Sequence, residues 1–376
     1  MIPIAKPYLT TDEAQAAYDT ILSGWITQGP KVAEFEQKFA EYTGANYAVA
    51  VSNCTTALHL AMIVAGVKQG DEVICPSMSY IATANCIKYV GATPVFAEVG
   101  EDYNIAIEDV KRKITEKTKA ILIVHQIGMP ADIDEFKMLC AHRNLILIED
   151  AACAIGSSYK GKKIGSHSDL VCFSFHPRKV ISTGDGGMIA TSRKDYADRI
   201  KLLRQHGMSV NDRVRHQSTK IIFEDHLELG YNYRMTDIQA SVGIKQLEKL
   251  DWIVEERRKI AKKYLQGLRN IDCIILPSES PDKFYNIQSF SIYLKENCPI
   301  NRNELMQELL DKGIATRRGV MTIHRETAYA YESISLPISE DLADRSIIIP
   351  LFVPMDDADI DYIIENLKTF IVPVKK

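Results

Sequence analysis

Several features that mark particular classes of protein are missing from this chain of 376 residues. No hydrophobic run reaches the ~20 residues that a membrane-spanning helix needs, and the most apolar windows, 120–124 and 347–353, are far shorter. The first seven residues, Met1 to Pro7, lack the apolar core of a secretory signal peptide. These absences predict a cytoplasmic protein without a membrane partner.

Clusters of positive charge and closely spaced cysteines are missing too. The formal net charge is -4, the pI is near 6.2, and the longest basic cluster, 160–163, is interrupted by Gly161. Nucleic-acid-binding surfaces are usually basic, so we expect no nucleic-acid partner. The eight cysteines form no Cys-x-x-Cys pair, which argues against zinc or redox motifs, and we predict no metal site.

What is present indicates a globular protein of two or three domains. Hydrophobic residues make up 46% of the chain and charged residues 25%, an ordinary balance. Strand-like apolar runs lie at 48–51, 72–75, 94–97, 120–124, 145–148, 170–174 and 187–190, and helical patterns lie at 55–65, 82–90 and 132–143. Strands that alternate with helices predict a mostly parallel sheet that is buried on both faces.

The C-terminal third has a different pattern. A long amphipathic helix is expected at 236–268, followed by strands at 289–294 and 346–349 and helices at 302–312 and 357–370. We therefore predict a large α/β domain, residues 1–250, and a smaller α+β domain, residues 251–376. In open parallel sheets ligands bind beyond the carboxyl ends of the strands, so residues just after strands are the candidates for function.

The first such segment leads from a strand into a helix through small polar residues. Ser52, Asn53, Thr55 and Thr56 surround the expected start of the helix. Free N–H groups at a helix N-terminus, together with threonine hydroxyls, suit a phosphate. The alternative is simple helix capping, the commoner role of these residue types.

Two further segments carry ionisable groups. Glu149 and Asp150 directly follow an apolar run, and only one of two neighbouring strand residues can face a given side of a sheet. Lys179 lies in a turn that a glycine-rich return, 184–187, closes. A buried lysine amine has a lowered pKa and can attack an aldehyde. The alternatives are an acidic helix cap for the acids and a solvated surface charge for the lysine.

The three segments together match the needs of one cofactor. Pyridoxal phosphate requires a phosphate site, an amine that forms an imine with its aldehyde, and a carboxylate that keeps its pyridine nitrogen protonated, since the ring withdraws electrons only in that state. Each signal alone is weak, and their combination predicts a pyridoxal-phosphate enzyme.

The sequence resembles the DegT/DnrJ/EryC1/StrS family of sugar aminotransferases over nearly its whole length. The matching motifs are 23–30, 76–85, 91–96, 149–152, the Lys179 segment, Gly230-Tyr231-Asn232-Tyr233-Arg234-Met235-Thr236-Asp237, and Thr316-Arg317 with the later His324. The resemblance implies the aspartate-aminotransferase fold (fold type I). This fold has a large domain with a mostly parallel central sheet flanked by helices, and a smaller α+β C-terminal domain.

By resemblance, three residues act on the cofactor ring. Lys179 forms the imine and later moves the proton between the substrate carbon and the cofactor. Asp150 pairs with the pyridine nitrogen, and Tyr80 stacks on the ring face. Cys153 lies close to the ring, at a position where family members commonly have glutamine, histidine or glutamate.

The resemblance also implies how the phosphate and the partner subunit are arranged. The phosphate is held by the backbone at Cys54, by Thr55 and Thr56, and by Ser174. Asn232 reaches the phosphate of the neighbouring subunit, so a homodimer with active sites at the interface is expected. The N-terminal segment, residues 1–30, contributes near the active site.

The implied reaction transfers an amino group from L-glutamate to a nucleotide-linked keto sugar. The acceptor is typically a 4-keto-6-deoxy sugar, and the amino sugar would serve surface polysaccharide or glycan synthesis. The candidate substrate-binding residues are Ile26, Thr27, His176, Arg317 and His324. For arginine and histidine a solvated surface position is the commoner role.

Three alternatives stay open. A 3-keto sugar or a keto-inositol would take the same chemistry, and the sequence does not distinguish these acceptors. Some relatives are sugar dehydratases in which histidine replaces the imine lysine, and the presence of Lys179 argues against that reaction. A non-catalytic regulatory homologue would be expected to have lost the lysine or the acid, and both are present.

Overall fold

A seven-stranded sheet forms the centre of the larger part of the molecule. The computed structural model describes residues 1–210, 221, 223–330 and 333–372. The strand order is β1-β9-β8-β5-β4-β2-β3, and only β9 runs antiparallel to its neighbours. The strands are β1 (Tyr47–Val51), β2 (Glu72–Pro76), β3 (Thr93–Ala97), β4 (Thr118–Val124), β5 (Ile146–Asp150), β8 (Val171–Ser174) and β9 (Gly187–Thr191). The mostly parallel sheet is therefore confirmed.

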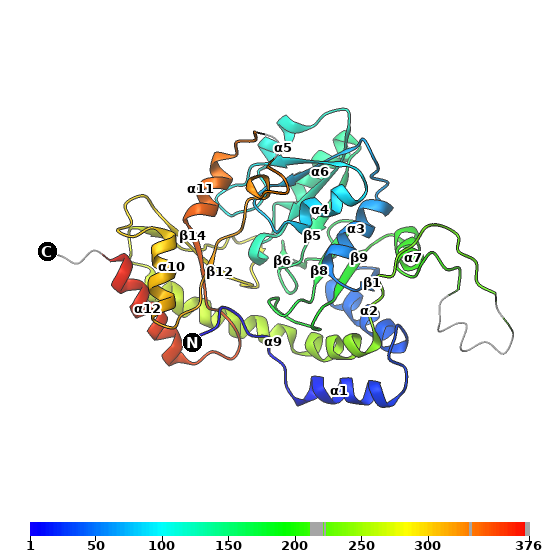
Figure 1. Cartoon of the computed structure of the whole chain (residues 1–376), viewed down its shortest axis with the longest axis horizontal. Coiled ribbons are helices and arrows are strands. Elements are labelled where there is room, and N and C mark those ends of the chain that lie inside the picture. The colour runs from blue at the N-terminus through cyan, green and yellow to red at the C-terminus, as the bar shows by residue number, and fades with distance from the viewer. Residues whose placement is uncertain (211–220, 222, 331–332, 373–376) are drawn as a thin grey trace.

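Helices cover both faces of this sheet (Figure 1). The helices α3 (Cys54–Val64), α4 (Ala82–Tyr89) and α7 (Lys194–Leu203) share one apolar core with alternate strand residues such as Ala120 and Leu122. The helices α2 (Pro30–Thr43), α6 (Ile133–Arg143) and α9 (Asp237–Leu268) share the other core with Ile121 and Ile123. The expected burial of both sheet faces is confirmed, because successive strand side chains point to opposite sides.

The C-terminal residues build a second, antiparallel sheet. Its order is β10-β12-β14-β13. Its strands are β10 (Ile274–Ile275), β12 (Phe290–Leu294), β13 (Arg317–Arg318) and β14 (Ser346–Ile349), and the nearby helices are α10 (Arg302–Asp311), α11 (Pro337–Arg345) and α12 (Asp357–Ile371). Ile2 forms a bridge with Ile314, so the start of the chain lies beside these elements (Figure 1). No helix of the described residues is long and apolar enough to cross a bilayer.

The proposed boundary between domains, at residue 250, falls inside α9. This helix packs against α1 (Thr11–Leu22) and α2 at one end and against α12 at the other. A small third sheet joins β11 (Lys283–Phe284) to β6 (Ser158–Tyr159) and β7 (Lys162–Lys163). One continuous helix and one small antiparallel sheet, whose strands come from both parts of the chain, thus connect the two parts. The division into domains stays a prediction.

The predicted helices and strands are all present within about two residues of their expected ends. One detail was wrong: Glu149 and Asp150 do not follow β5 but are its last two residues. Several helices were not predicted from the sequence: α1, α2, α5 (Ile107–Lys113), α7 and α11.

Helix α1 is attached to α9 through a buried carboxylate. Glu13 accepts hydrogen bonds from Thr10 N at 2.7 Å, which caps the helix, and from Lys249 Nζ and Gln246 Nε2 on α9 at 2.9 Å each. The side chain is buried although it is charged. Burial opposes the charge, but these three partners outweigh it and lower the pKa of Glu13 from 4.5 to about 2.

We expect Glu13→Gln to destabilise the protein by about 2–3 kcal/mol at neutral pH. A carboxyl group with a depressed pKa stabilises the folded state above about pH 4.5, and this stabilisation is lost as the pH falls toward 2. The variant should therefore lose less stability than the parent between pH 5 and pH 3 in urea unfolding. The control is Asp19→Asn, an exposed carboxylate on the same helix. If the free energy of unfolding fell by the same amount between pH 5 and pH 3 in the parent and in the Glu13 variant, this account would be wrong.

Candidate active site

Four neighbouring strands bring the predicted site segments to one edge of the main sheet. Gly187, the first residue of β9, is paired on one side with Val51, the last residue of β1, and on the other with Ser174, the last residue of β8. β5 lies next to β8, with Asp150 paired to Cys172. Ser174 and Asp150 therefore lie on adjacent strands at the carboxyl edge of the sheet. The start of α3, which follows β1, lies at the same edge, as the sequence predicted.

Gly187 allows the start of α3 to lie directly against β9. A Cβ atom at this position would lie 2.5 Å from the carbonyl carbon and oxygen of Asn53 and 2.8 Å from the Cys54 nitrogen. No side chain fits there without moving backbone. Ser174, opposite Gly187, consequently lies beside the N-terminus of α3.

Part of the predicted phosphate site is used by the helix cap. Asn53 Oδ1 accepts from Thr56 N at 2.9 Å, and the Thr56 hydroxyl donates to Asn53 O at 2.7 Å. The capping alternative is therefore confirmed for Asn53 and Thr56. The N–H groups of Cys54 and Thr55 and the Thr55 hydroxyl have no partner among the described residues. These three groups are free to bind an anion.

Asp150 presents a buried carboxylate to the site. Its Oδ2 accepts from the Thr83 hydroxyl at 3.0 Å and its Oδ1 from Ala152 N at 3.1 Å. Burial raises the pKa of Asp150, although the Ala152 bond, the charge of Lys179 and the Thr83 bond act in the opposite direction. A cationic N–H partner would offset the cost of keeping this charge buried.

Glu149 points to the other side of the sheet, as the alternation of strand side chains predicts. Its Oε2 lies 2.7 Å from His125 Nε2, and both side chains are fully buried. His125 Nδ1 accepts from Ala131 N at 3.1 Å, so Nε2 carries the proton that is donated to Glu149. The His125 bond lowers the pKa of Glu149 against the effect of burial. The pair keeps Glu149 away from the site.

The Lys179 side chain reaches Cys153, and its charge acts on Asp150. Its backbone N–H donates to His176 O at 2.8 Å, and its amine donates to Cys153 Sγ at 3.1 Å. Burial opposes the ammonium charge, but Cys153 and Asp150 favour it, and the pKa of Lys179 is raised. The lowered pKa expected from burial is therefore wrong for the protein alone, because the neighbouring groups outweigh desolvation.

Tyr80 precedes α4 and leaves its ring exposed. The side chain is 68% exposed, and Thr83 N donates to Tyr80 O at 3.0 Å, so one turn separates this ring from the residue that binds Asp150. Such a ring is available to stack on a ligand. Arg317 is close enough for its charge to interact with Tyr80 and Cys153; burial and the nearby Arg178 lower the pKa of its guanidinium.

Three other residues predicted from the sequence for the site are His176, Asn232 and Ile26. His176 Nδ1 accepts from Arg178 N at 3.2 Å within the lysine turn. Asn232 is exposed, and its neighbour Tyr233 accepts at 2.9 Å from Ser52 N, just before α3. Ile26 is exposed as well. Within the described residues, no hydrogen bond or ion pair joins the Asn232 or Ile26 side chain to Lys179, so their roles stay predictions.

Asp237 connects two of the sequence motifs. Its carboxylate accepts from the N–H groups of Gly29, Lys31 and Val32 at 2.7–2.9 Å and so caps α2. Asp237 N in turn donates to Thr27 O at 3.0 Å. The contacts fix the path of the loop that carries Thr27 and do not themselves place its side chain against a substrate.

His324 is buried between the two parts of the chain. Its Nδ1 lies 2.6 Å from Ser77 Oγ and its Nε2 lies 3.0 Å from Glu340 Oε1. Both ring nitrogens therefore have protein partners. The substrate-binding role expected for His324 has no support from these contacts and stays a prediction.

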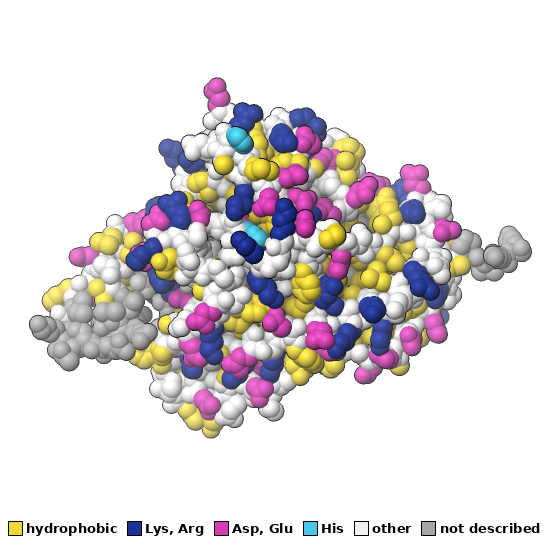
Figure 2. Space-filling view, turned by 180° about the vertical axis from the view of Figure 1, so that it is seen from behind, with side chains coloured by type: hydrophobic (Ala, Val, Ile, Leu, Met, Phe, Trp, Pro, Cys, Tyr) yellow, Lys and Arg dark blue, Asp and Glu magenta, His cyan; other side chains and the backbone are white. Residues whose placement is uncertain are grey.

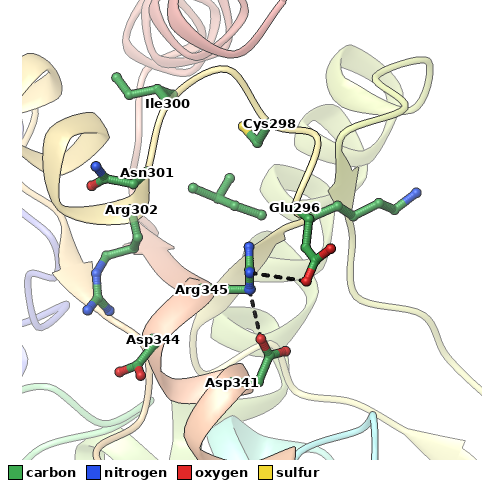
Figure 3. A pocket seen from close by; sticks show the side chains of 10 residues that line it. Glu296, Cys298, Ile300, Asn301, Arg302, Asp341, Asp344 and Arg345 are labelled. Carbon is green, nitrogen blue, oxygen red and sulfur yellow. Dashed lines mark hydrogen bonds and ion pairs between the residues drawn. The ribbon is translucent and has the colours of Figure 1, made fainter.

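A separate pocket of about 390 Å³ lies away from these groups, among residues 294–302 and 341–345 (Figure 3). Arg345 there pairs with Asp341 at 2.7 Å and with Glu296 at 3.6 Å. None of the candidate site residues lines it. On the face shown in Figure 2, acidic and basic side chains are intermixed.

Three supporting residues were not identified from the sequence: Thr83, His125 and Asn286. Thr83 is part of the 76–85 motif, and a hydroxyl one turn after Tyr80 was the available signal. Asn286 Nδ2 donates to Cys153 O at 2.8 Å from 133 positions away, and no local pattern could have shown this.

The residues present fit pyridoxal phosphate. The free N–H groups at α3, placed beside Ser174 by Gly187, suit its phosphate. The Lys179 amine and the buried Asp150 carboxylate each act on the other's ionisation, as two charges close together at the carboxyl edge of the sheet would do.

Comparisons with known proteins agree with this reading. The profile of the DegT/DnrJ/EryC1/StrS aminotransferase family matches residues 7–368. The chain is 38% identical to GDP-perosamine synthase of Escherichia coli O157:H7, covering 98% of both chains, and 36% identical to that of Vibrio cholerae, covering 98% of this chain and 99% of the relative. Its fold superposes on a solved structure from Streptococcus pneumoniae, titled as the putative sugar aminotransferase Spr1654 in its PMP form. The TM-score is 0.93 at 29% identity, and the match covers 98% of this chain and 99% of that chain.

Proposed function

The chain belongs to the DegT/DnrJ/EryC1/StrS aminotransferase family, and we propose that it transfers an amino group from L-glutamate to a GDP-linked 4-keto-6-deoxy sugar. The proposal is supported by the position of Asp150 and Ser174 on neighbouring strands beside the free N–H groups of α3, with the charge of Lys179 close enough to act on Asp150. The proposal includes a cytoplasmic homodimer that makes an amino sugar for surface polysaccharide or glycan synthesis.

Each residue has a separate task in this proposal. Pyridoxal phosphate supplies the electron sink that stabilises a carbanion next to nitrogen. Lys179 binds the cofactor covalently and holds or releases a proton at its Nζ atom. Asp150 holds the pyridine nitrogen in its protonated state, and Tyr80 covers the ring. Cys54 N, Thr55 and Ser174 orient the phosphate.

The choice of acceptor rests on the relatives. Two relatives are named GDP-perosamine synthases, which favours a GDP-linked acceptor. The resemblance to the family favours a 4-keto-6-deoxy sugar as the part that accepts the amine. The same chemistry at carbon 3, or on a keto-inositol, is the alternative.

A panel of acceptors tests the proposal. The purified enzyme would receive GDP-, dTDP- and UDP-linked 4-keto-6-deoxy sugars, a 3-keto sugar nucleotide and a keto-inositol, each with glutamate, aspartate or alanine as donor. We expect GDP-perosamine to form with the highest kcat/KM and glutamate to be the best donor, as measured by mass spectrometry of the products. Faster amination of another acceptor would overturn the assignment.

The homodimer and the role of Asn232 can be tested together. Asn232 is exposed, and so are two large apolar side chains a few positions before it in the sequence, Leu227 at 64% and Leu229 at 84%, which supports a covering partner.

We expect Lys179→Ala and Asn232→Ala each to be nearly inactive alone. Subunit exchange between them should restore up to about a quarter of the parent activity, since half of the dimers are hybrid and each hybrid has one intact site. Each variant mixed with itself is the control. If mixing restores no activity although mass spectrometry detects hybrid dimers, Asn232 does not act across the interface.

A further inference from the structure

Cys153 differs from most other cysteines in both exposure and contacts. Six of the eight cysteines are buried, whereas Cys153 and Cys298 are partly exposed. The Cys153 sulfur accepts a hydrogen bond from the Lys179 amine at 3.1 Å. A partly exposed thiol thus lies in contact with the most important amine of the site.

The contact is fixed from both sides by one segment. Asn286 Nδ2 donates to Cys153 O and to Ile155 O, each at 2.8 Å, and Asn286 N donates to Ser157 Oγ at 3.1 Å. Two residues later, Gln288 Nε2 donates at 2.8 Å to Arg178 O, the residue before Lys179. The backbones that carry the thiol and the amine are therefore both bound to residues 286–288, which keeps sulfur and nitrogen close.

Gly128 reinforces this arrangement. A Cβ atom at this position would lie 2.0 Å from Asn286 Oδ1 and 3.0 Å from Cys153 O. Ser157 Oγ also donates to Gly128 O at 2.7 Å. The close packing around Asn286 and Cys153 O leaves the backbone at Cys153 little room to move.

We propose that Cys153 and Lys179 form a reversible sulfur–nitrogen cross-link under peroxide whenever Lys179 is not joined to the cofactor. In the first step hydrogen peroxide oxidises the thiol by two electrons: Cys–SH and H₂O₂ give Cys–SOH and H₂O. In the second step the Lys179 ammonium gives one proton to water, and the resulting amine attacks the sulfur and displaces its oxygen: Cys–SOH and Lys–NH₃⁺ give Cys–S–NH–Lys, H₂O and H⁺.

The cross-link is reversible by thiols and has a protective consequence. Two thiols RSH regenerate Cys–SH and Lys–NH₂ and leave as the disulfide RSSR, so atoms and electrons balance. Sulfenic acids otherwise proceed to sulfinic and sulfonic acids, which are essentially irreversible. The link therefore stores a cofactor-free enzyme in a form that reduction restores, and cofactor bound to Lys179 prevents it.

The experiment compares the full-length enzyme with bound cofactor and after removal of the cofactor. Both forms are treated with a small molar excess of hydrogen peroxide and examined by intact mass and peptide mapping. In the cofactor-free form we expect a species that lacks two hydrogen atoms, mapping to a peptide pair joined at Cys153 and Lys179 and disappearing with dithiothreitol. In the cofactor-bound form the joined pair should fall to background.

Three variants make the result decisive. Lys179→Ala should show no joined pair and should accumulate sulfinic acid at Cys153, with circular dichroism confirming its fold. Cys153→Ser should show neither product. Cys298→Ser, which removes the other partly exposed thiol, should behave as the parent. Trapping of Cys153 sulfenic acid by dimedone without any joined pair, or a two-hydrogen loss that maps to a pair of cysteines, would overturn the proposal.

Discussion

Lys179→Ala should lower turnover by about 10⁴-fold or more while leaving the fold intact. In the proposed function this residue supplies both the covalent attachment of the cofactor and the proton movement at the substrate carbon, and acid–base catalysis alone contributes about 10²–10⁴-fold. The backbone bond from Lys179 to His176 O does not involve the side chain, so the turn should persist. The measurement is kcat together with the visible spectrum before and after borohydride.

The spectrum distinguishes loss of catalysis from loss of binding. The parent protein should retain cofactor covalently after borohydride and denaturation, and the variant should release all of it. Lys179→Arg retains the positive charge and the contact with Cys153 but cannot form the link. If Lys179→Arg turned over at more than a few per cent of the parent rate, the charge and not the covalent link would be the essential property of the residue.

The strands of the main sheet could be predicted largely from local sequence, because the apolar runs that form β1, β4 and β5 are short, separated and rich in branched residues. The end of β5 was misplaced because acidic residues are rare inside strands. Here the structure accommodates them: Glu149 is paired with His125, and Asp150 faces the site. The rule that strand residues are apolar therefore fails at the end of β5, next to the predicted site.

Helix α1 buries no large apolar side chain, because its Tyr18, Ile21 and Leu22 are exposed. Its buried residues are Glu13 and Thr20, and its attachment to α9 includes the polar contacts of Glu13 with Lys249 and Gln246. A hydrophobic-periodicity argument finds helices by the apolar stripe that they bury, so a helix that buries a carboxylate is not recognised. Only the capping pair of Thr10 and Glu13 indicated it.

The parts of the site that could not be predicted depend on long-range contacts. By resemblance the sequence placed both Lys179 and Cys153 at the cofactor ring. It did not predict their hydrogen bond, and it gave the wrong direction for the pKa of Lys179. His324 belongs to a recognised motif, yet it is bonded to Ser77, 247 positions away. A sequence motif shows which residue types stand at which positions. The pKa values and hydrogen bonds of those residues depend on neighbours that only the folded chain brings together.

Asp150→Asn should lower turnover by about 10²–10³-fold, the usual effect of removing one preorganised electrostatic group. The amide has the same shape and can still accept from Ala152 N, as the carboxylate does at 3.1 Å, but it cannot balance a positive charge on the pyridine nitrogen. The measurement is kcat together with cofactor affinity from absorbance titration. Thr83→Val is a milder change for comparison with Asp150→Asn, because it leaves the carboxylate in place. It removes one charge-assisted bond worth about 1.5–3 kcal/mol and should weaken cofactor binding by roughly tenfold or more.

The pH dependence of the same titrations tests the charge itself. Burial raises the pKa of Asp150 above 3.8, so in the parent acidification protonates this group earlier than a free aspartate. Cofactor affinity should therefore fall as the pH drops through that raised pKa, because only the carboxylate stabilises the cationic ring nitrogen. Asp150→Asn has no proton to gain at this position, so its cofactor affinity should not fall over the pH range in which Asp150 is protonated in the parent. An Asn variant whose affinity fell over that range as the parent's does would show that another group controls the pyridine nitrogen, and the pairing of Asp150 with the ring would have to be abandoned.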